Sequence, residues 1–142
     1  MSPRARIAYT VIELVLVLAL AGIVMGIAFP RFQLSLDRIT VHSAASDVLA
    51  TLHSARSFAL SSRTSVAVDV DGAAGTMRVR SGPTLLFSRN IGHAHGVQLS
   101  QSRDSLAFGP LGLGRGAANL SIIVRRRAAA ETVFVSRLGR IR

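Results

Sequence analysis

The sequence predicts an α+β protein in which one long N-terminal helix packs on an antiparallel β-sheet. Two observations predict this fold class. An apolar run over residues 9–29 continues, beyond Pro30, as a stretch with helical periodicity up to residue 63. From residue 64 to residue 142 the period changes to two, which is typical of strands. With 142 residues, the chain has room for one small folded domain besides a membrane segment.

The apolar run has the length of a membrane-spanning helix. At about 1.5 Å per residue, residues 9–29 measure about 31 Å as a helix, which matches a hydrocarbon core about 30 Å thick. The preceding residues carry Arg4 and Arg6 and no acid. Because positive charges flank the cytoplasmic side of such helices, we expect a cytoplasmic N-terminus and a single crossing.

Glu13 stands at the head of this run, followed by uncharged residues from Leu14 to Phe29. The segment is also compatible with a secretory signal peptide cut at Gly26-Ile27-Ala28, which would leave a mature protein that begins at Phe29, or with a plain anchor helix. Neither alternative explains why a carboxylate stands at position 13. An unpaired carboxylate in lipid costs roughly 2.5–3.5 kcal/mol near the helix centre, and such residues usually have a partner.

The stretch Ala8-Tyr9-Thr10-Val11-Ile12-Glu13-Leu14, with a short basic leader before it, resembles the type III signal of type IV pilins and type II secretion pseudopilins. The resemblance implies that residues 1–8 are a leader peptide, that prepilin peptidase cuts between Ala8 and Tyr9, and that the new amino terminus of Tyr9 is methylated. The family usually has glycine before the cut and phenylalanine after it, whereas this chain has Ala8 and Tyr9.

The resemblance also implies a partner for Glu13. In a helical stack of subunits, the carboxylate of one chain can neutralise the α-amine of its neighbour, which offsets burial and fixes the axial register. The expected protein is therefore a pilin-like subunit, anchored in the inner membrane of a bacterium, with its head in the periplasm. Its implied partners are other pilin or pseudopilin subunits, prepilin peptidase and membrane lipid.

Beyond the membrane run, the sequence predicts that the helix continues as an amphipathic half. Pro30 is expected to kink or interrupt the helix because it lacks an N–H group. Apolar residues then recur every three or four positions and predict a stripe that packs on the head: Phe32, Leu36, Ile39, Ala45, Val48, Leu52, Ala55 and Ala59.

Short alternating segments separated by turns predict the strands of the head. Residues 66–70 and 76–80 form an expected hairpin across the turn 71–75, with Asp69 and Asp71 near Arg78 and Arg80. Further strands are expected at residues 84–88, 97–100, 105–108, 120–124 and 132–136. We interpret them as an antiparallel sheet packed on the outer half of the helix.

The C-terminal pattern is similar to the head of the GspH/FimT family of minor pilins and pseudopilins. The segments that carry this similarity are Phe108-Gly109-Pro110-Leu111-Gly112, Leu120-Ser121-Ile122, Val133-Phe134-Val135-Ser136 and Gly139-Arg140. The resemblance implies a non-enzymatic subunit of a short periplasmic filament, which serves either type II secretion or a type IV pilus.

The sequence predicts no catalytic, cofactor or metal site. Cysteine is absent, and His93 and His95 have no third ligand in a recognisable pattern, so we interpret them as exposed polar residues. The Gly-rich loop 109–116 lacks the Gly-Lys-Ser/Thr ending of a phosphate loop and leads into a strand. Asp104 and Glu131 are too far apart in the sequence to indicate an acid/base pair.

Arginine supplies all of the net charge of +10, because the chain contains no lysine. Six arginines lie between residues 125 and 142, beside the single acid Glu131: Arg125, Arg126, Arg127, Arg137, Arg140 and Arg142. One interpretation is a solvated hairpin tip at residues 125–127 and a frayed terminus. The other is a phosphate-contacting patch, without base stacking because few aromatic residues accompany it.

The tail Gly139-Arg140-Ile141-Arg142 also resembles the Gly-Arg-x-Arg ending of minor pilins that bind DNA during natural transformation. The resemblance implies that Arg140 and Arg142 contact DNA. Because a closing Gly-Arg is common in the whole branch, DNA binding is an alternative to the purely structural role.

Overall fold

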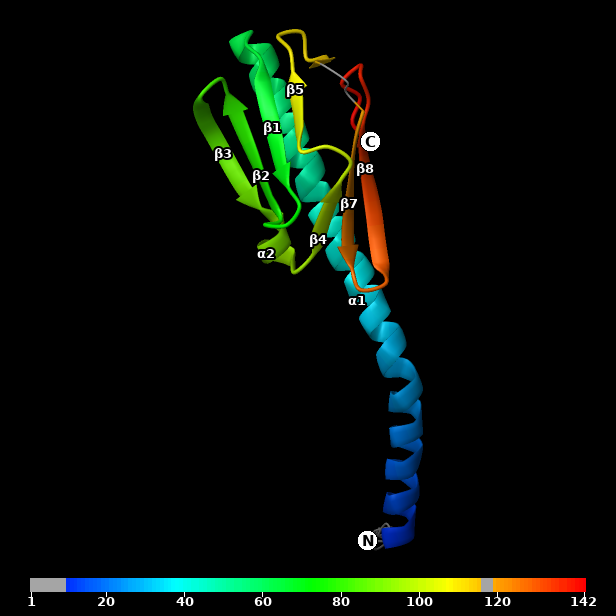
Figure 1. Cartoon of the computed structure of the whole chain (residues 1–142). Coiled ribbons are helices and arrows are strands. Elements are labelled where there is room, and N and C mark those ends of the chain that lie inside the picture. The colour runs from blue at the N-terminus through cyan, green and yellow to red at the C-terminus, as the bar shows by residue number, and fades with distance from the viewer. Residues whose placement is uncertain (1–9, 116–118) are drawn as a thin grey trace, which may run out of the picture. The chain divides into compact units, whose positions relative to one another are not determined.

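The computed structural model describes residues 10–115 and 119–142 (Figure 1). The chain divides into two compact units, residues 1–35 and 36–142. The first helix, α1 (Val11–Ser62), contributes to both units. The leader and the expected cut between Ala8 and Tyr9 lie outside the described residues.

In the first unit, α1 exposes its apolar side chains. The most apolar stretch of 18 residues is long and apolar enough to cross a membrane, and none of it is buried. Pro30 lies inside α1 and does not interrupt it. Because proline has no N–H group, the helix loses one hydrogen bond at this point. The expected kink at Pro30 stays a prediction.

In the second unit, α1 buries one stripe against the head. The buried residues are Asp37, Val41, Ala44, Ala45, Val48, Thr51, Leu52, Ala55 and Ala59. Their spacing of three and four residues confirms the amphipathic helix from Ala45 onward. The start of the predicted stripe was wrong, because Phe32, Leu36 and Ile39 are 63%, 47% and 66% exposed.

Five strands form the first sheet, in the order β3-β2-β1-β5-β6. They are β1 (Val66–Asp71), β2 (Thr76–Ser81), β3 (Thr84–Asn90), β5 (Ser105–Phe108) and β6 (Gly114–Arg115). All neighbouring strands are antiparallel. The predicted hairpin of β1 and β2 is confirmed, with Asp69 opposite Arg78 and an ion pair of 2.5 Å between Asp69 and Arg80.

Three strands form a second antiparallel sheet, in the order β4-β7-β8. They are β4 (Gln98–Gln101), β7 (Leu120–Arg126) and β8 (Ala129–Val135), and the short helix α2 (Ile91–His95) precedes β4. The predicted fold class, a long helix packed on antiparallel strands, is confirmed, and the strands divide between two sheets. Alternation within a strand identifies the strand, but it does not identify which strands pair.

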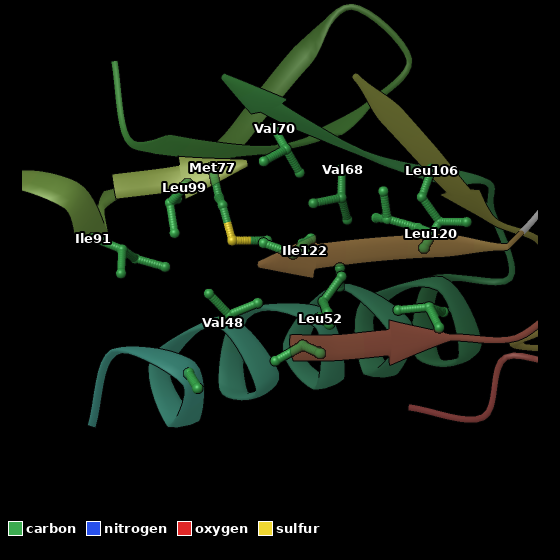
Figure 2. Close-up of a cluster of buried hydrophobic side chains, with 14 of the residues drawn as sticks. Val48, Leu52, Val68, Val70, Met77, Ile91, Leu99, Leu106, Leu120 and Ile122 are labelled. Atoms are coloured by element: carbon green, nitrogen blue, oxygen red, sulfur yellow. The ribbon is translucent and has the colours of Figure 1, made fainter. Parts of the chain in front are cut away.

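The core of the head lies between α1 and both sheets. Figure 2 shows Val48 and Leu52 of α1 facing Val68, Leu120 and Ile122 of the strands. Each of these five residues is at most 1% exposed. Because each buried aliphatic side chain contributes about 1.5–3 kcal/mol, this interior fixes both sheets on the helix.

Candidate functional site

The N-terminal end of α1 holds Glu13 in a helix cap. The backbone N–H of Glu13 donates to the side-chain oxygen of Thr10 at 3.3 Å, and the N–H of Leu14 donates to the Thr10 carbonyl at 3.2 Å. Thr10 is thus the residue that caps the helix, and Glu13 stands three residues later, the spacing of a capping box. The carboxylate of Glu13 lies in the first turn, where the helix dipole favours a negative charge.

The β7–β8 hairpin separates the C-terminal arginines into two groups. Arg125 and Arg126 pair with Ala130 and Ala129 at the turn of the hairpin, as Figure 1 shows for the lower end of these strands. Arg137, Arg140 and Arg142 follow the far end of β8. Because a strand of seven residues measures roughly 20 Å, the two groups do not form one patch.

The hairpin turn contacts α1 through a buried carboxylate. Asp37, whose side chain is 4% exposed, forms an ion pair with Arg126 Nε at 3.0 Å and accepts hydrogen bonds from Arg127 Nη1 at 3.2 and 3.3 Å. Arg126 also donates to the carbonyl of His95 at 3.0 Å. Arg126 and Arg127 thus hold the hairpin on the helix, a role that their positions in the sequence do not indicate.

Two further polar pairs connect α1 to the head. His95 Nε2 lies 2.7 Å from the carboxylate oxygen Oδ2 of Asp47. His42 Nδ1 lies 3.2 Å from the carboxylate oxygen Oε2 of Glu131. The interpretation of His93 and His95 as exposed residues is correct for His93 alone, because the side chain of His95 is 20% exposed. Its position on α2, beside α1, explains the difference.

The tail of the chain folds back on β8 and is not frayed. Phe134 and Arg142 exchange two backbone hydrogen bonds of 2.9 Å, Ser136 N–H donates to the Arg140 carbonyl at 2.9 Å, and Val135 pairs with Ile141. In this antiparallel register, Arg142 lies directly opposite Phe134. The side chains of Arg137, Arg140 and Arg142 are exposed.

A groove of about 630 Å³ lies on the outer face of the second sheet, beside this tail. Its lining combines an aromatic ring, two cations and several small polar groups. The lining side chains are Phe134, Leu138, Arg140, Arg142, Ser102, Asn119, Ser121 and Ser136, with Leu120 and Val135 beneath. Phe134 is 56% exposed and Leu138 is 75% exposed. Phe134 is thus the aromatic residue that lines this groove together with Arg140 and Arg142.

The Gly-rich loop supports the tail. Gly112 and Gly139 both have positive φ angles, 69° and 71°. A Cβ atom on Gly139 would clash with the Gly112 carbonyl oxygen, so this close approach requires glycine. The Gly114 N–H also donates to the Arg137 carbonyl at 3.2 Å. The loop thus serves as packing for the turn that leads to Arg140.

Comparison with known families gives a match over most of the head. The family described as "Type II transport protein GspH" matches residues 44–139, about two thirds of the chain. The chain belongs to the GspH family. This result confirms the relationship that the sequence patterns indicated, and it makes the protein a minor pilin or pseudopilin.

Solved structures confirm the fold of this GspH-family protein. The type IV minor pilin FimU of Pseudomonas aeruginosa, in a crystal of space group P21, aligns with a TM-score of 0.64 and 20% identity, over 75% of this chain and 89% of FimU. A second crystal form, P65, aligns with a TM-score of 0.60 and 16% identity, over 71% of this chain and 90% of that one. No curated protein sequence gives a significant match.

Proposed function

We propose that this GspH-family protein is a filament subunit that prepilin peptidase cuts between Ala8 and Tyr9 and methylates at Tyr9. The subunit is held in the bacterial inner membrane by residues 9–29, with its head in the periplasm, and enters the filament of a type II secretion system or a type IV pilus. The observation that carries the proposal is the exposed apolar part of α1, with the acid Glu13 in its first turn.

The cap at Thr10 does not fully account for Glu13. A favourable position in the first turn of a helix contributes about 0.3–1 kcal/mol to a carboxylate. Burial in lipid costs roughly 2.5–3.5 kcal/mol at the centre of a bilayer and less near its surface. The cost of burial that the helix position does not offset can be offset by a nearby cation. In this proposal, the α-amine of Tyr9 on a neighbouring subunit is that cation.

Glutamine at position 13 tests the proposal. Glu13→Gln keeps the size of the side chain and removes the charge, so we expect cleavage and membrane insertion to persist while the subunit is lost from sheared filaments. Glu131→Gln is the matched control, because it changes the only other glutamate of the chain, which lies in the head. Normal incorporation of Glu13→Gln would refute the charge pairing.

A second candidate function is DNA binding by the tail. Arg137, Arg140 and Arg142 are exposed, and no carboxylate of the described residues pairs with them. By contrast, Arg126 and Arg127 are engaged by Asp37, so the proposal is confined to the tail. For duplex DNA, each phosphate contact contributes about −0.9 to the slope of log K against log salt.

Duplex binding is measured on the full chain in a neutral detergent. The double change Arg140→Ala and Arg142→Ala should weaken binding to all sequences alike and reduce the salt slope by about 1.8, the sum of two contacts. Arg125→Ala, at the other end of the hairpin, is the matched control. An unchanged affinity in the double variant would remove the role assigned to the tail.

A further inference from the structure

We propose that the groove beside the tail binds single-stranded nucleic acid, with one base stacked on Phe134 and phosphates held by Arg140 and Arg142. This inference rests on the second candidate function and goes beyond it, because it assigns a residue and a strand preference that arginines alone do not provide.

The backbone register places the ring and the cations on one face. Phe134 and Arg142 are directly opposite each other, because each donates a backbone N–H to the other's carbonyl at 2.9 Å. Side chains at directly opposite positions of antiparallel strands lie on the same face, roughly 5 Å apart at Cβ. The next pair along the two strands is Val135 and Ile141, whose side chains point to the opposite face, and Val135 is only 2% exposed. Arg140, two residues before Arg142, returns to the face of Phe134.

The exposed ring of Phe134 is suited to contact a ligand with a flat apolar surface. A phenylalanine ring that is 56% exposed leaves one apolar face in water, within a groove whose volume of about 630 Å³ accommodates a nucleobase. Bases stack on such rings whatever their sequence, because every base has a π face. In a duplex the bases are stacked on one another, so Phe134 would reach them only in a single strand.

The remaining groups of the groove fit a nucleotide better than an acidic peptide. Ser102, Asn119 and Ser121 line the side of the groove away from the tail and offer both donors and acceptors. The carboxylates of an acidic peptide only accept hydrogen bonds, so they would use only the donors of the groove. The edges of nucleobases carry both donors and acceptors, so they can use both. The site therefore combines two cations for phosphates, a ring for a base and polar groups for its edge.

The test compares ligands on the full chain in a neutral detergent. The probes are a fifteen-residue oligothymidine, an abasic strand of the same length, a duplex of that length and poly-L-glutamate. Phe134→Leu should weaken binding of oligothymidine by roughly 5- to 140-fold, the range that stacking of one base gives, with no change in the salt slope. Binding of the abasic strand, the duplex and poly-L-glutamate should not change.

The arginine variant gives the opposite pattern. Changing Arg140 and Arg142 to alanine should weaken every polyanion and should reduce the salt slope for single strands by about 1.4, from two contacts of about 0.7 each. Leu111→Ala is the control for an exposed apolar residue outside the groove, since Leu111 is 77% exposed and does not line it. We expect this variant to bind every probe normally.

Three results would overturn the inference, and the first two are distinguishable from a general failure of DNA binding. If Phe134→Leu binds oligothymidine normally while the arginine variant loses all DNA, the tail binds DNA without stacking. If the wild-type chain binds poly-L-glutamate as tightly as oligothymidine, and Phe134→Leu weakens both alike, the groove is a site for an acidic protein. If no DNA binds the wild-type chain, the second candidate function fails together with this inference.

Discussion

Truncation of Arg126 is expected to loosen the β7–β8 hairpin from α1. The change Arg126→Ala removes the 3.0 Å contact of its Nε with Asp37 and leaves that carboxylate, 4% exposed, without its closest cation. Loss of one partner from a fully buried ion pair costs about 3–5 kcal/mol. Because the side chain of Arg126 is 34% exposed, water can enter at the vacated place, and we expect about 2–3 kcal/mol.

Thermal unfolding of the full chain in detergent, followed by circular dichroism, measures this loss. For a head of this size, about 2–3 kcal/mol corresponds to a midpoint lower by roughly 10–20 °C. Hydrogen exchange should also increase in the hairpin turn more than in the five-stranded sheet, because the lost contact joins the turn to α1.

Neighbouring arginines provide the controls. Arg127→Ala should cost less than about 1 kcal/mol because that side chain is 65% exposed, and Arg125→Ala should have almost no effect because Arg125 forms no ion pair within residues 10–115 and 119–142. An Asp37→Asn background should remove much of the effect of Arg126→Ala. If Arg126→Ala and Arg125→Ala are equally stable, the buried pair does not hold the hairpin.

Three further changes should follow from packing and turn geometry, each measured as the unfolding free energy of the full chain. Leu52→Ala, in the fully buried core, should cost about 2–5 kcal/mol, and a loss below about 1 kcal/mol would mean that the interior is not packed as described. Gly139→Ala should cost at least about 1–2 kcal/mol from its positive φ alone and more from the approach to the Gly112 carbonyl, so a neutral result would contradict the turn. Arg80→Ala should cost less than about 1 kcal/mol, because water reaches both side chains of its pair with Asp69, which are 45% and 29% exposed, and a loss of several kcal/mol would show a structural role that the geometry does not indicate.

Local patterns in the sequence were sufficient for most elements of the fold. The apolar run, the three- and four-residue spacing from Ala45 to Ala59 and the alternation in β1 and β2 each reflect a period that the backbone imposes. The five residues of α2 and the two of β6 are too few to show a period. Their formation depends on neighbours that lie far away in the sequence.

The candidate sites depended more on contacts between distant residues. Asp37 is an acid within a helix of mixed composition, and only the fold brings Arg126, 89 positions away, to its side. In the sequence, Phe134 looks like an ordinary strand residue. Only the fold shows that the tail turns back along β8 and places Arg142 opposite it. The arginines at 125–127 and 137–142 are close in sequence, yet the length of β8 separates them.

Mass spectrometry of the protein from its native membrane tests the filament proposal most directly, because the pairing of Glu13 requires a new α-amine on a neighbouring chain. The proposal predicts a mature chain that begins at Tyr9 and carries one methyl group on its amino terminus. A chain that begins at Phe29, or one that retains residues 1–8, would contradict it.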